Sequence, residues 1–402
     1  MKFAGIIAEY DPFHNGHAWQ LAQARALGAQ QVAVAMSCGL TQRGAPPLLP
    51  ETVRTRAALR CGADFVFALP APFACAGAEA FARAGTSLLA AAGCDALIFG
   101  AETPDAALLM EAARVLASEE YRIALKAQLA AGARSFAAAR QAAVEALCPG
   151  SDLAALLDQP NNNLAVEYCK AILELHLPLT PVPLPRQGAN HGEALKSGQQ
   201  FASASALRAL WAAQGVEALR PYVPAAVFPL YQEAAASGDY TDFPAAGRCE
   251  LALLRAQCSA GQGTPFAAVR GVSEGLEHRL AKGVRTCATL EELLDALTTV
   301  RYPRARMRRL AMDAALGYRA DALPALPPYL HLLGAARKDL LRIFKDAALP
   351  ISHSLMRLQE AGPTCASLVQ AQCSASDFAA FCRANPRPMG EALRQKIIFL
   401  TI

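Results

Sequence analysis

The sequence lacks the long apolar runs of a membrane protein and the leader of a secreted one. A helix that spans a membrane needs about 20 apolar residues with few charges, and the nearest candidate, residues 84–100, is broken by Gly93 and Asp95. The N-terminus carries one lysine and a short apolar run, residues 3–8, followed by acidic residues, which is not the pattern of a signal peptide. We therefore expect a cytoplasmic protein that does not enter a membrane.

Paired cysteines and a strong net charge are also missing. None of the 12 cysteines forms a Cys-x-x-Cys pair or a Cys/His cluster at zinc-ligand spacing, so we expect reduced thiols and no metal held by the protein. The net charge of +4 gives no argument for a nucleic-acid partner from the molecule as a whole. Apolar residues, by contrast, make up 53% of 402 residues, which is enough for a sizeable core in two or three domains.

Short apolar runs alternate with helical patterns in the first quarter of the chain. The predicted strands are residues 2–8, 31–36, 64–69 and 95–99, and the predicted helices between them are 17–27, 52–61 and 76–91. This alternation predicts βαβ units and therefore an α/β domain with a Rossmann-like parallel sheet.

The rest of the chain is predicted to be mainly helical. Expected helices are 104–131, 136–147, from Asn161-Asn162-Asn163 to about 175, 203–212, 291–299, 303–317, 328–346, 352–361 and 376–383, with an extended segment at 178–185. Little strand character is visible after residue 215. We therefore predict an α/β domain at 1–214 and a mostly α-helical domain at 215–402.

His14-Asn15-Gly16-His17 lies where the first predicted strand leads into its helix. Ligands of open α/β sheets bind at the carboxyl ends of strands, and helix N-termini present N–H groups to anions. The two histidines share one helix face, and Gly16 lets a nucleotide approach the backbone. This pattern favours binding of a nucleoside triphosphate during attack at its α-phosphate, with His14 and His17 as catalytic candidates. Two polar surface histidines are the alternative.

Two elements resemble the HIGH-type nucleotidyltransferases, which share the class I tRNA synthetase-like (HUP-type) fold. One is the motif at residues 14–17, and the other is residues 202–208, which are similar to the I-S-S-T-x-I-R element of that superfamily. Further motifs, in the same order along the chain, resemble the bacterial tRNA(Met) cytidine acetate ligases. They are residues 6–17, Gln42-Arg43-Gly44, 62–64, 99–102, 160–162, 167–168 and 273–277.

The resemblance implies a two-step activity. Such a ligase activates acetate with ATP to acetyl-adenylate and then transfers the acetyl group to N4 of the wobble cytidine of elongator tRNA(Met), which gives N4-acetylcytidine. It also implies that residues 1–214 form the ATP- and acetate-activating domain and that 215–402 bind tRNA. ATP is thus an expected substrate, Mg²⁺ is expected to accompany it, and no protein partner is implied.

The resemblance also implies where ATP binds. Within the stretch from residue 7 to 20 the candidates are Ile7, Ala8, Glu9, Tyr10, Asp11, Pro12, Phe13, His14, Asn15, Gly16 and His17. Beyond it they are Gly100, Asn161 or its neighbour Asn162, Arg186, Ser203 and Arg208. An arginine fork suits phosphate oxygens, and an amide can contact adenine or ribose. A helix cap is the alternative for Asn161, and a surface helix position is the alternative for Arg208.

Gln42 and Arg43 are expected on a loop at the same edge of the sheet, where they could contact substrate or the cytidine strand; a solvated turn is the alternative. The surroundings of this loop depart from the family pattern at residues 37–40, 45–47 and 68–70, where a polar side chain and two carboxylates are replaced. The phosphate-handling motifs are intact, so these departures bear on the choice of acceptor more than on ATP.

A basic cluster lies in the second predicted domain. Residues 301–310 carry five arginines and no acidic residue, beside Tyr302. We expect Arg301, Arg304, Arg306, Arg308 and Arg309 to bind tRNA, because basic residues with an aromatic neighbour suit an RNA backbone and an unpaired base. A solvated helix face is the alternative.

Two other functions stay open on the sequence. One is a small-molecule adenylyltransferase that shares the HIGH motif and the second phosphate element. The other is an RNA-binding protein whose catalysis has decayed, which the missing carboxylates favour and the intact histidine pair opposes.

Overall fold

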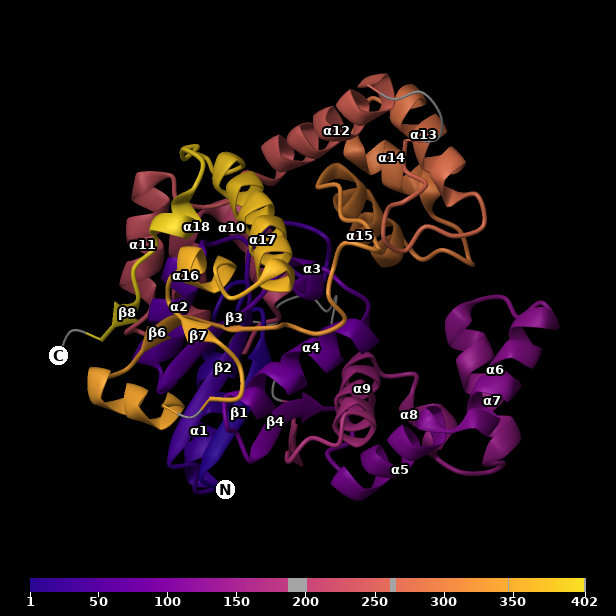
Figure 1. Ribbon diagram of the computed structural model, residues 1–402, viewed down its shortest axis with the longest axis horizontal. Helices are drawn as coiled ribbons and strands as arrows, with labels where there is room; N and C mark the ends of the chain where they lie inside the picture. Colours follow the sequence, from indigo (N-terminus) through magenta and orange to yellow (C-terminus); the bar gives the residue numbers. More distant parts are fainter. Residues whose placement is uncertain (187–200, 261–264, 346, 401–402) are drawn as a thin grey trace.

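The computed structural model describes residues 1–186, 201–260, 265–345 and 347–400. Five parallel strands form the centre of its sheet and confirm the predicted Rossmann-like arrangement (Figure 1). They are β1 (Phe3–Ala8), β2 (Gln31–Ser37), β3 (Phe65–Leu69), β4 (Ala96–Ala101) and β5 (Thr180–Pro185). The first four match the predicted strands, and β5 lies in the predicted extended segment.

The order of these strands predicts a ligand site beside β1. The order is β5-β4-β1-β2-β3, so the chain moves outwards from β1 to β3 and then crosses back to β4 on the other side of β1. In open α/β sheets, ligands bind outside the carboxyl ends of the strands at such a reversal. The loop after β1 and the end of β4 meet at that point.

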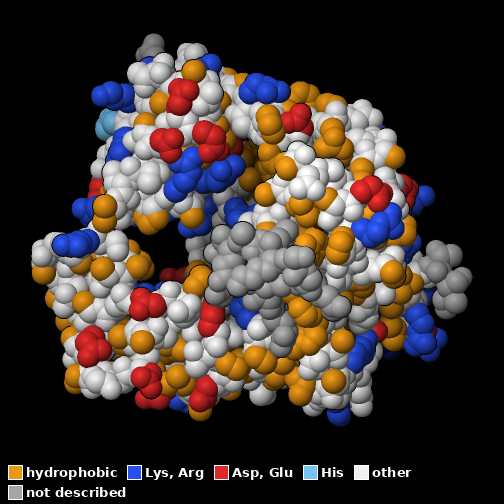
Figure 2. Space-filling view, turned by 180° about the vertical axis from the view of Figure 1, so that it is seen from behind, with side chains coloured by type: hydrophobic (Ala, Val, Ile, Leu, Met, Phe, Trp, Pro, Cys, Tyr) orange, Lys and Arg blue, Asp and Glu red, His pale blue; other side chains and the backbone are white. Residues whose placement is uncertain are grey.

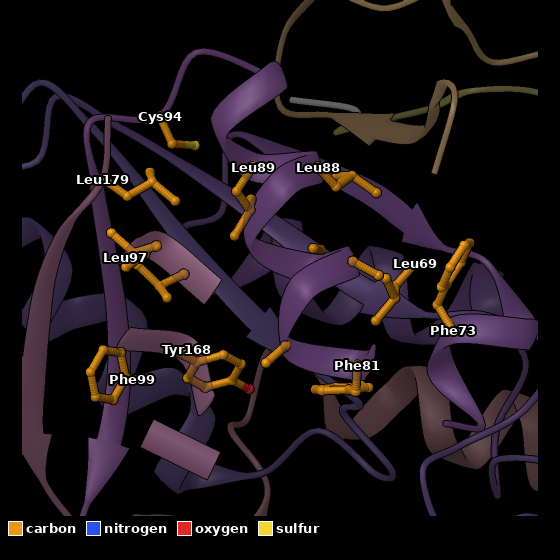
Figure 3. Close-up of a cluster of buried hydrophobic side chains, with 14 of the residues drawn as sticks. Leu69, Phe73, Phe81, Leu88, Leu89, Cys94, Leu97, Phe99, Tyr168 and Leu179 are labelled. Carbon is orange, nitrogen blue, oxygen red and sulfur yellow. The ribbon is translucent and has the colours of Figure 1, made fainter. Parts of the chain in front are cut away.

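Helices cover both faces of the sheet and enclose one apolar core on each. α4 (Ala78–Ala91) and α9 (Pro160–Glu174) pack on one face, where Leu88, Leu97 and Tyr168 are buried together (Figure 3). The opposite core contains Ile6 and Val34. It is covered by α1 (Asn15–Ala26), α2 (Glu51–Arg60), α10 (Ala204–Gln214), the 3₁₀ helix η1 (Val216–Tyr222) and α11 (Phe228–Ser237). Burial of both faces explains why the strands are continuous apolar runs.

Two helical lobes project from this body (Figure 1). The first lies between β4 and α9 in the sequence. Its α5 (Ala106–Ala117) packs on α9 as part of the body, and α6 (Glu119–Ala130), α7 (Phe136–Leu147) and α8 (Leu153–Leu156) extend from there. The second, called here the α12–α15 lobe, contains α12 (Phe243–Ala260), α13 (Leu276–Thr286), α14 (Leu290–Leu297) and α15 (Arg304–Ala315). The second lobe has its own apolar core, which includes Leu254, Leu280, Leu294 and Met307.

After this lobe the chain returns to the sheet. β6 (Leu330–Ala335) pairs antiparallel with β3, and β7 (Ile351–Ser352) and β8 (Ile398–Phe399) pair with β6. The remaining elements are α3 (Ala71–Ala74), the 3₁₀ helix η2 (Lys338–Phe344), α16 (Leu355–Gln359), α17 (Pro363–Phe381) and α18 (Glu391–Arg394). The predicted helix at 328–346 is therefore wrong, because an apolar run of six residues satisfies a buried strand equally well. The division at residue 214 stays a prediction.

Among the described residues, no helix combines the length and the apolar character that crossing a membrane requires.

Candidate active site

A cavity of about 430 Å³ lies at the carboxyl edge of the sheet, beside the ends of β1 and β4. This volume suits a small-molecule ligand. Most of the predicted site residues line it, namely Ile7, Ala8, Glu9, Tyr10, Asp11, His14, Gly16, His17, Gln42, Arg43, Gly100, Asn161, Arg186 and Ser203. The fold therefore brings these residues together from distant parts of the sequence, and their contacts with ATP stay predictions.

The first turns of three helices contribute to the cavity wall. They are the starts of α1 at His14 and Gly16, of α9 at Pro160 and Asn161, and of α10 at Ser203. Each helix N-terminus carries a partial positive charge that favours an anion. The start of α9 is already occupied, because the Glu102 carboxylate accepts its backbone N–H groups. The starts of α1 and α10 are capped by the side chains of His14 and Ser203 and, among the described residues, by no carboxylate, so their partial positive charge is not neutralised and can favour a phosphate group.

The two histidines cap the helix that they begin. His14 is the N-cap of α1, and its Nδ1 accepts the backbone N–H of Gly16 at 3.1 Å. In return, Nδ1 of His17 accepts the backbone N–H of His14 at 3.2 Å. The rings stack with their centroids 3.7 Å apart. This reciprocal capping box fixes both imidazoles at the mouth of α1.

These bonds determine what the histidines can offer a ligand. Burial, with the nearby Arg186 charge, lowers the pKa of His14 to about 3, and burial with His14 and Arg186 lowers the pKa of His17 well below its usual range. Both rings are therefore neutral near pH 7. Because each Nδ1 accepts a hydrogen bond, the single proton of each ring lies on Nε2. Among the described residues, the site consequently offers two neutral N–H donors and the guanidinium groups of Arg43 and Arg186 to a bound anion.

Asp11 holds the loop after β1 against two other segments. Its Oδ1 accepts the backbone N–H of Leu48 at 2.6 Å, and its Oδ2 forms an ion pair of 2.9 Å with Arg208 of α10. Arg208 also donates to the Asp11 carbonyl. Arg208 is thus a buried residue that positions the loop, and its predicted alternative as a surface helix residue does not fit this structure, since only 13% of its side chain is exposed.

Glu9 joins the ends of β1 and β2. Its Oε1 accepts the backbone N–H of Gln42 at 2.6 Å. Below it, the buried Arg54 donates to the carbonyls of Glu9, Ser37 and Leu49. Burial and the neighbouring Asp11 charge raise the pKa of Glu9, whereas the Gln42 N–H and the charge of Arg43 oppose the rise. The loop that carries Gln42 and Arg43 is therefore ordered by the strand that carries the histidine motif.

Asn161 and Asn162 take different positions at the start of α9. Asn161 lines the cavity, and its side-chain amide donates to Glu102. Asn162 is fully buried, where its side chain accepts from the backbone of Thr103 and donates to the Thr103 hydroxyl. The N-cap of α9 is Gln159, so Asn161 is not the cap that the sequence offered as its alternative role.

Five of the predicted ATP-binding residues do not line the cavity: Pro12, Phe13, Asn15, Asn162 and Arg208. Phe13 is buried, and its carbonyl accepts the hydroxyl of Tyr231 at 2.7 Å. Asn15 donates to the carbonyl of Pro221 at 3.1 Å. These bonds attach the histidine loop to η1 and α11, and ATP binding by the five residues stays a prediction.

The cavity also has an apolar wall, which the sequence analysis did not assign to the site. Phe81 of α4, Phe99 of β4, and Leu164 and Tyr168 of α9 line it. Figure 3 shows Phe99 beside Tyr168, and their ring centroids lie 5.6 Å apart. Phe99 and Tyr168 lie in the motifs 99–102 and 167–168, which could have indicated them. Phe81 and Leu164 occur on faces expected to be core, and this pattern does not distinguish core from a ligand surface.

The predicted arginine cluster lies on α15 and the residue stretch before it, and three of its members pair with acidic side chains. Arg301 pairs with Glu274, Arg304 with Glu291 and Asp295, and Arg308 with Glu291. Arg306 instead donates to the Ser273 hydroxyl and lies over the ring of Tyr302. Figure 2 shows Lys and Arg side chains gathered on this lobe beside an opening that separates it from α6 and α7. Their contacts with RNA stay predictions.

The arginine helix touches the loop of the cavity. Arg309 donates to the carbonyl of Gln42 at 3.2 Å. Gly44 packs so closely on α15 that a Cβ there would lie 2.9 Å from the backbone of Arg308, and its φ of +75° also favours glycine. The basic surface and the cavity are therefore adjacent, which the sequence did not indicate.

Comparison with known proteins places the chain in a family. Residues 1–391 match the family model described as HIGH Nucleotidyl Transferase. Two relatives named tRNA(Met) cytidine acetate ligase, from Syntrophotalea carbinolica and Caldicellulosiruptor saccharolyticus, are 35% and 34% identical, over 89% and 83% of this chain and 86% and 82% of theirs. The chain belongs to the tRNA(Met) cytidine acetate ligases of the HIGH nucleotidyl transferase family. The resemblance seen in the sequence is thereby confirmed.

Solved structures of this ligase family agree over the whole length. The Thermotoga maritima protein TmcAL, bound with alpha-thio ATP, matches with a TM-score of 0.89 and 26% identity. Its apo form matches with a TM-score of 0.90 and 27% identity. Both comparisons cover 100% of each chain. The α/β nucleotidyltransferase fold is therefore confirmed, lobes included.

Proposed function

We propose that this chain activates acetate with ATP to acetyl-adenylate and transfers the acetyl group to N4 of the wobble cytidine of elongator tRNA(Met). Membership of the cytidine acetate ligase family supports this function. The observation that carries it is the cavity at the strand-order reversal, where two neutral imidazole N–H donors, Arg186 and the starts of α1 and α10 converge. The ATP-analogue complex of the Thermotoga relative supports ATP as the ligand of this cavity.

In the proposed first step, an acetate oxygen attacks the α-phosphorus and pyrophosphate leaves. His14 and His17 would donate from Nε2 to phosphate oxygens, and the Arg186 guanidinium would balance their charge. Donors fixed in advance within a buried site stabilise developing charge without reorganisation. Phosphoryl chemistry of this kind depends mainly on positioning and charge stabilisation.

Mg²⁺ accompanies the triphosphate in this proposal, because phosphate oxygens are hard ligands that suit it. Within residues 1–186, 201–260, 265–345 and 347–400, no group of three or more His, Cys, Asp or Glu side chains could hold a metal ion. The ion would therefore be bound mainly by ATP itself.

In the proposed second step, the tRNA docks on the α12–α15 lobe and its wobble cytidine enters the cavity. The contact between Arg309 and Gln42 supports this path, because it puts the basic helix directly beside the cavity wall. The cytoplasm, where tRNA is found, is the proposed location.

The experiment that tests this function follows both steps in one reaction. Purified protein is incubated with ATP, labelled acetate and tRNA(Met) transcripts, pyrophosphate release is measured, and the digested RNA is analysed for N4-acetylcytidine by mass spectrometry. A transcript with uridine at the wobble position is the matched control and should stay unmodified. Acetyl-adenylate without N4-acetylcytidine would indicate another acceptor, and ATP binding without either product would indicate a decayed RNA-binding protein.

A further inference from the structure

The proposed transfer step releases a proton that some group must accept. The N4 nitrogen of cytidine forms a bond to the acetyl carbon, the bond from that carbon to the phosphate oxygen breaks, and AMP leaves. An N4 proton departs at the same time. An amine of such low basicity reacts faster when a positioned base removes this proton.

The two histidines are not suited to this task. Nδ1 of each ring already accepts a backbone N–H, and Nε2 carries the proton of the neutral ring. Neither ring has a lone pair left for a further proton, and burial keeps the pKa of both far below the usual range. Their chemistry here is donation to phosphate.

Of the residues that the structure describes, two carboxylates line the cavity, and one of them is fully engaged. Asp11 uses Oδ1 to accept from Leu48 and Oδ2 to pair with Arg208. Glu9 uses Oε1 to accept from Gln42, while its Oε2 accepts no hydrogen bond from any residue that the structure describes. Tyr10 and Tyr168 also line the cavity, but burial raises the pKa of both hydroxyls, so they keep their protons.

Glu9 also lies at the end of the cavity where the acceptor would arrive. Its bonding partner Gln42 is the residue whose carbonyl accepts from Arg309 of the basic helix. Gln42 and Arg43 line the cavity between that helix and Glu9. A base entering from the α12–α15 lobe past Gln42 therefore comes to Glu9.

We propose that Glu9 is the base that accepts the proton from N4 of the cytidine as the acetyl group is transferred. This role rests on the proposed function and assigns Glu9 to its second step. The proton moves from N4 to Oε2, and the protonated Glu9 returns it to water after the product leaves.

The surroundings of Glu9 make its carboxylate a stronger base than that of a free glutamate. Burial and Asp11 raise its pKa, while Arg43 after β2 and Arg208 of α10 oppose the rise, and the hydroxyl of Tyr168 on α9 lies near enough to sense its charge. Only the deprotonated carboxylate accepts a proton. The transfer rate should therefore rise with pH through the raised pKa of Glu9, and adenylate formation should not show that rise.

The test separates the two steps with one isosteric variant. Glu9→Gln keeps an oxygen that accepts from Gln42 but cannot accept a proton, whereas Glu9→Ala loses both properties. Adenylate formation is measured as acetate-dependent pyrophosphate release. Transfer is measured as N4-acetylcytidine formed from synthetic acetyl-adenylate and tRNA(Met) transcript between pH 5 and 9.

We expect Glu9→Gln to reduce transfer about a hundredfold more than adenylate formation and to abolish the rise of transfer with pH. Equal losses in the two steps, or a pH profile like that of the unchanged protein, would overturn the assignment and leave Glu9 a residue that positions Gln42. The thermal melting temperature of both variants shows whether the fold is kept. Failure of the unchanged protein to acetylate the transcript would instead overturn the proposed function and this role with it.

Discussion

The cavity and the arginine surface lie side by side, but water reaches their polar side chains to very different extents. In the cavity, His14 and His17 are held by backbone hydrogen bonds, and burial keeps them uncharged. On α15, the Arg304 side chain is 39% exposed and shares its charge with two acidic neighbours.

This difference in solvation determines how much each residue contributes. Electrostatic interactions are strong where water is excluded and weak where it is present. A single donor in the cavity should therefore matter greatly to the chemistry. On the basic surface, by contrast, RNA binding is expected to be shared among several arginines, each with a small and salt-dependent contribution.

The largest effect is expected from the cavity. His17→Ala should lower the rate of adenylate formation about a thousandfold, because a donor aimed at developing charge contributes about 10²–10³ to a rate. Acetate-dependent pyrophosphate release measures this rate. Binding of tRNA should remain, since the arginines proposed to bind it lie on α15 and the residues before it and not at His17.

His17→Asn is the matched variant for this prediction. Its side-chain oxygen can replace Nδ1 as acceptor of the His14 N–H, so the start of α1 should keep its stability, but it lacks the Nε2 donor. We expect it to melt like the unchanged protein and to be as slow as His17→Ala. Normal pyrophosphate release from either variant would remove His17 from the mechanism.

The next effect concerns the ion pair that supports the cavity. Arg208→Ala should lower the free energy of unfolding by about 3 kcal/mol, because it leaves the Asp11 carboxylate buried without its cation. Urea denaturation measures the loss, and the second change Asp11→Asn should recover part of it. Arg220→Ala is the control, because the Arg220–Glu217 pair is 59% exposed on both sides, and it should change stability little. Equal effects of the two variants would contradict the comparison.

A buried carboxylate beneath the arginine helix should give an effect that depends on pH. Burial raises the pKa of Glu250 to about 8. Between its usual pKa and this value the unfolded chain releases a proton that the folded chain holds, so the protein loses stability as pH rises. Glu250→Gln should remove this loss and be more stable by about 2 kcal/mol at pH 8 than the unchanged protein, but not at pH 4. Urea denaturation midpoints of Glu250→Gln and of the unchanged protein at both pH values test this prediction. Glu233→Gln on the exposed face of α11 is the control. A gain in stability of Glu250→Gln that does not depend on pH would contradict the prediction.

The smallest expected effect is a difference in tRNA binding between alanine substitutions of two arginines on the same surface. Arg306 has no acidic partner among the described residues, whereas Arg304 has two. Arg306→Ala should weaken tRNA binding about tenfold and lower the salt slope by about 1, and Arg304→Ala should have about a twofold effect. Affinities are compared at stated salt concentrations. A larger loss for Arg304 would mean that its ion pairs open on binding.

The central sheet could be predicted because its strands are short apolar runs between turn residues, and each is buried on both faces. The strand Leu330–Ala335 is also a short apolar run, but it was predicted to be part of a helix. Its sequence suits a strand or a helix, and only its pairing with β3, more than 260 positions earlier in the chain, distinguishes the two. Pairing of this kind is a property of the folded chain, and local periodicity does not contain it.

Site residues that belong to a sequence motif could be predicted. Contacts that depend on how distant segments pack together could not. His14 and His17 stand out because of their spacing after a strand. The pairing of Arg208 with Asp11 and the hydrogen bond of Asn161 to Glu102 join segments far apart in sequence. Likewise, the sequence shows five arginines but not the acidic partners that α14 and the residues just before α13 place beside three of them.

The tight fit of Gly44 on α15 has a consequence for anyone who recombines this protein with its relatives. At Gly44 the loop packs against backbone atoms of the helix, so no side chain at this point could be trimmed to accept a foreign partner. Close by, the Arg309 side chain holds the Gln42 carbonyl. A chimaera that exchanges residues 243–315 alone would set an unfamiliar helix against this loop and displace Gln42 from the cavity wall. The loop at 39–47 and the lobe should therefore be exchanged as one cassette, and natural sequence changes in one should be accompanied by changes in the other.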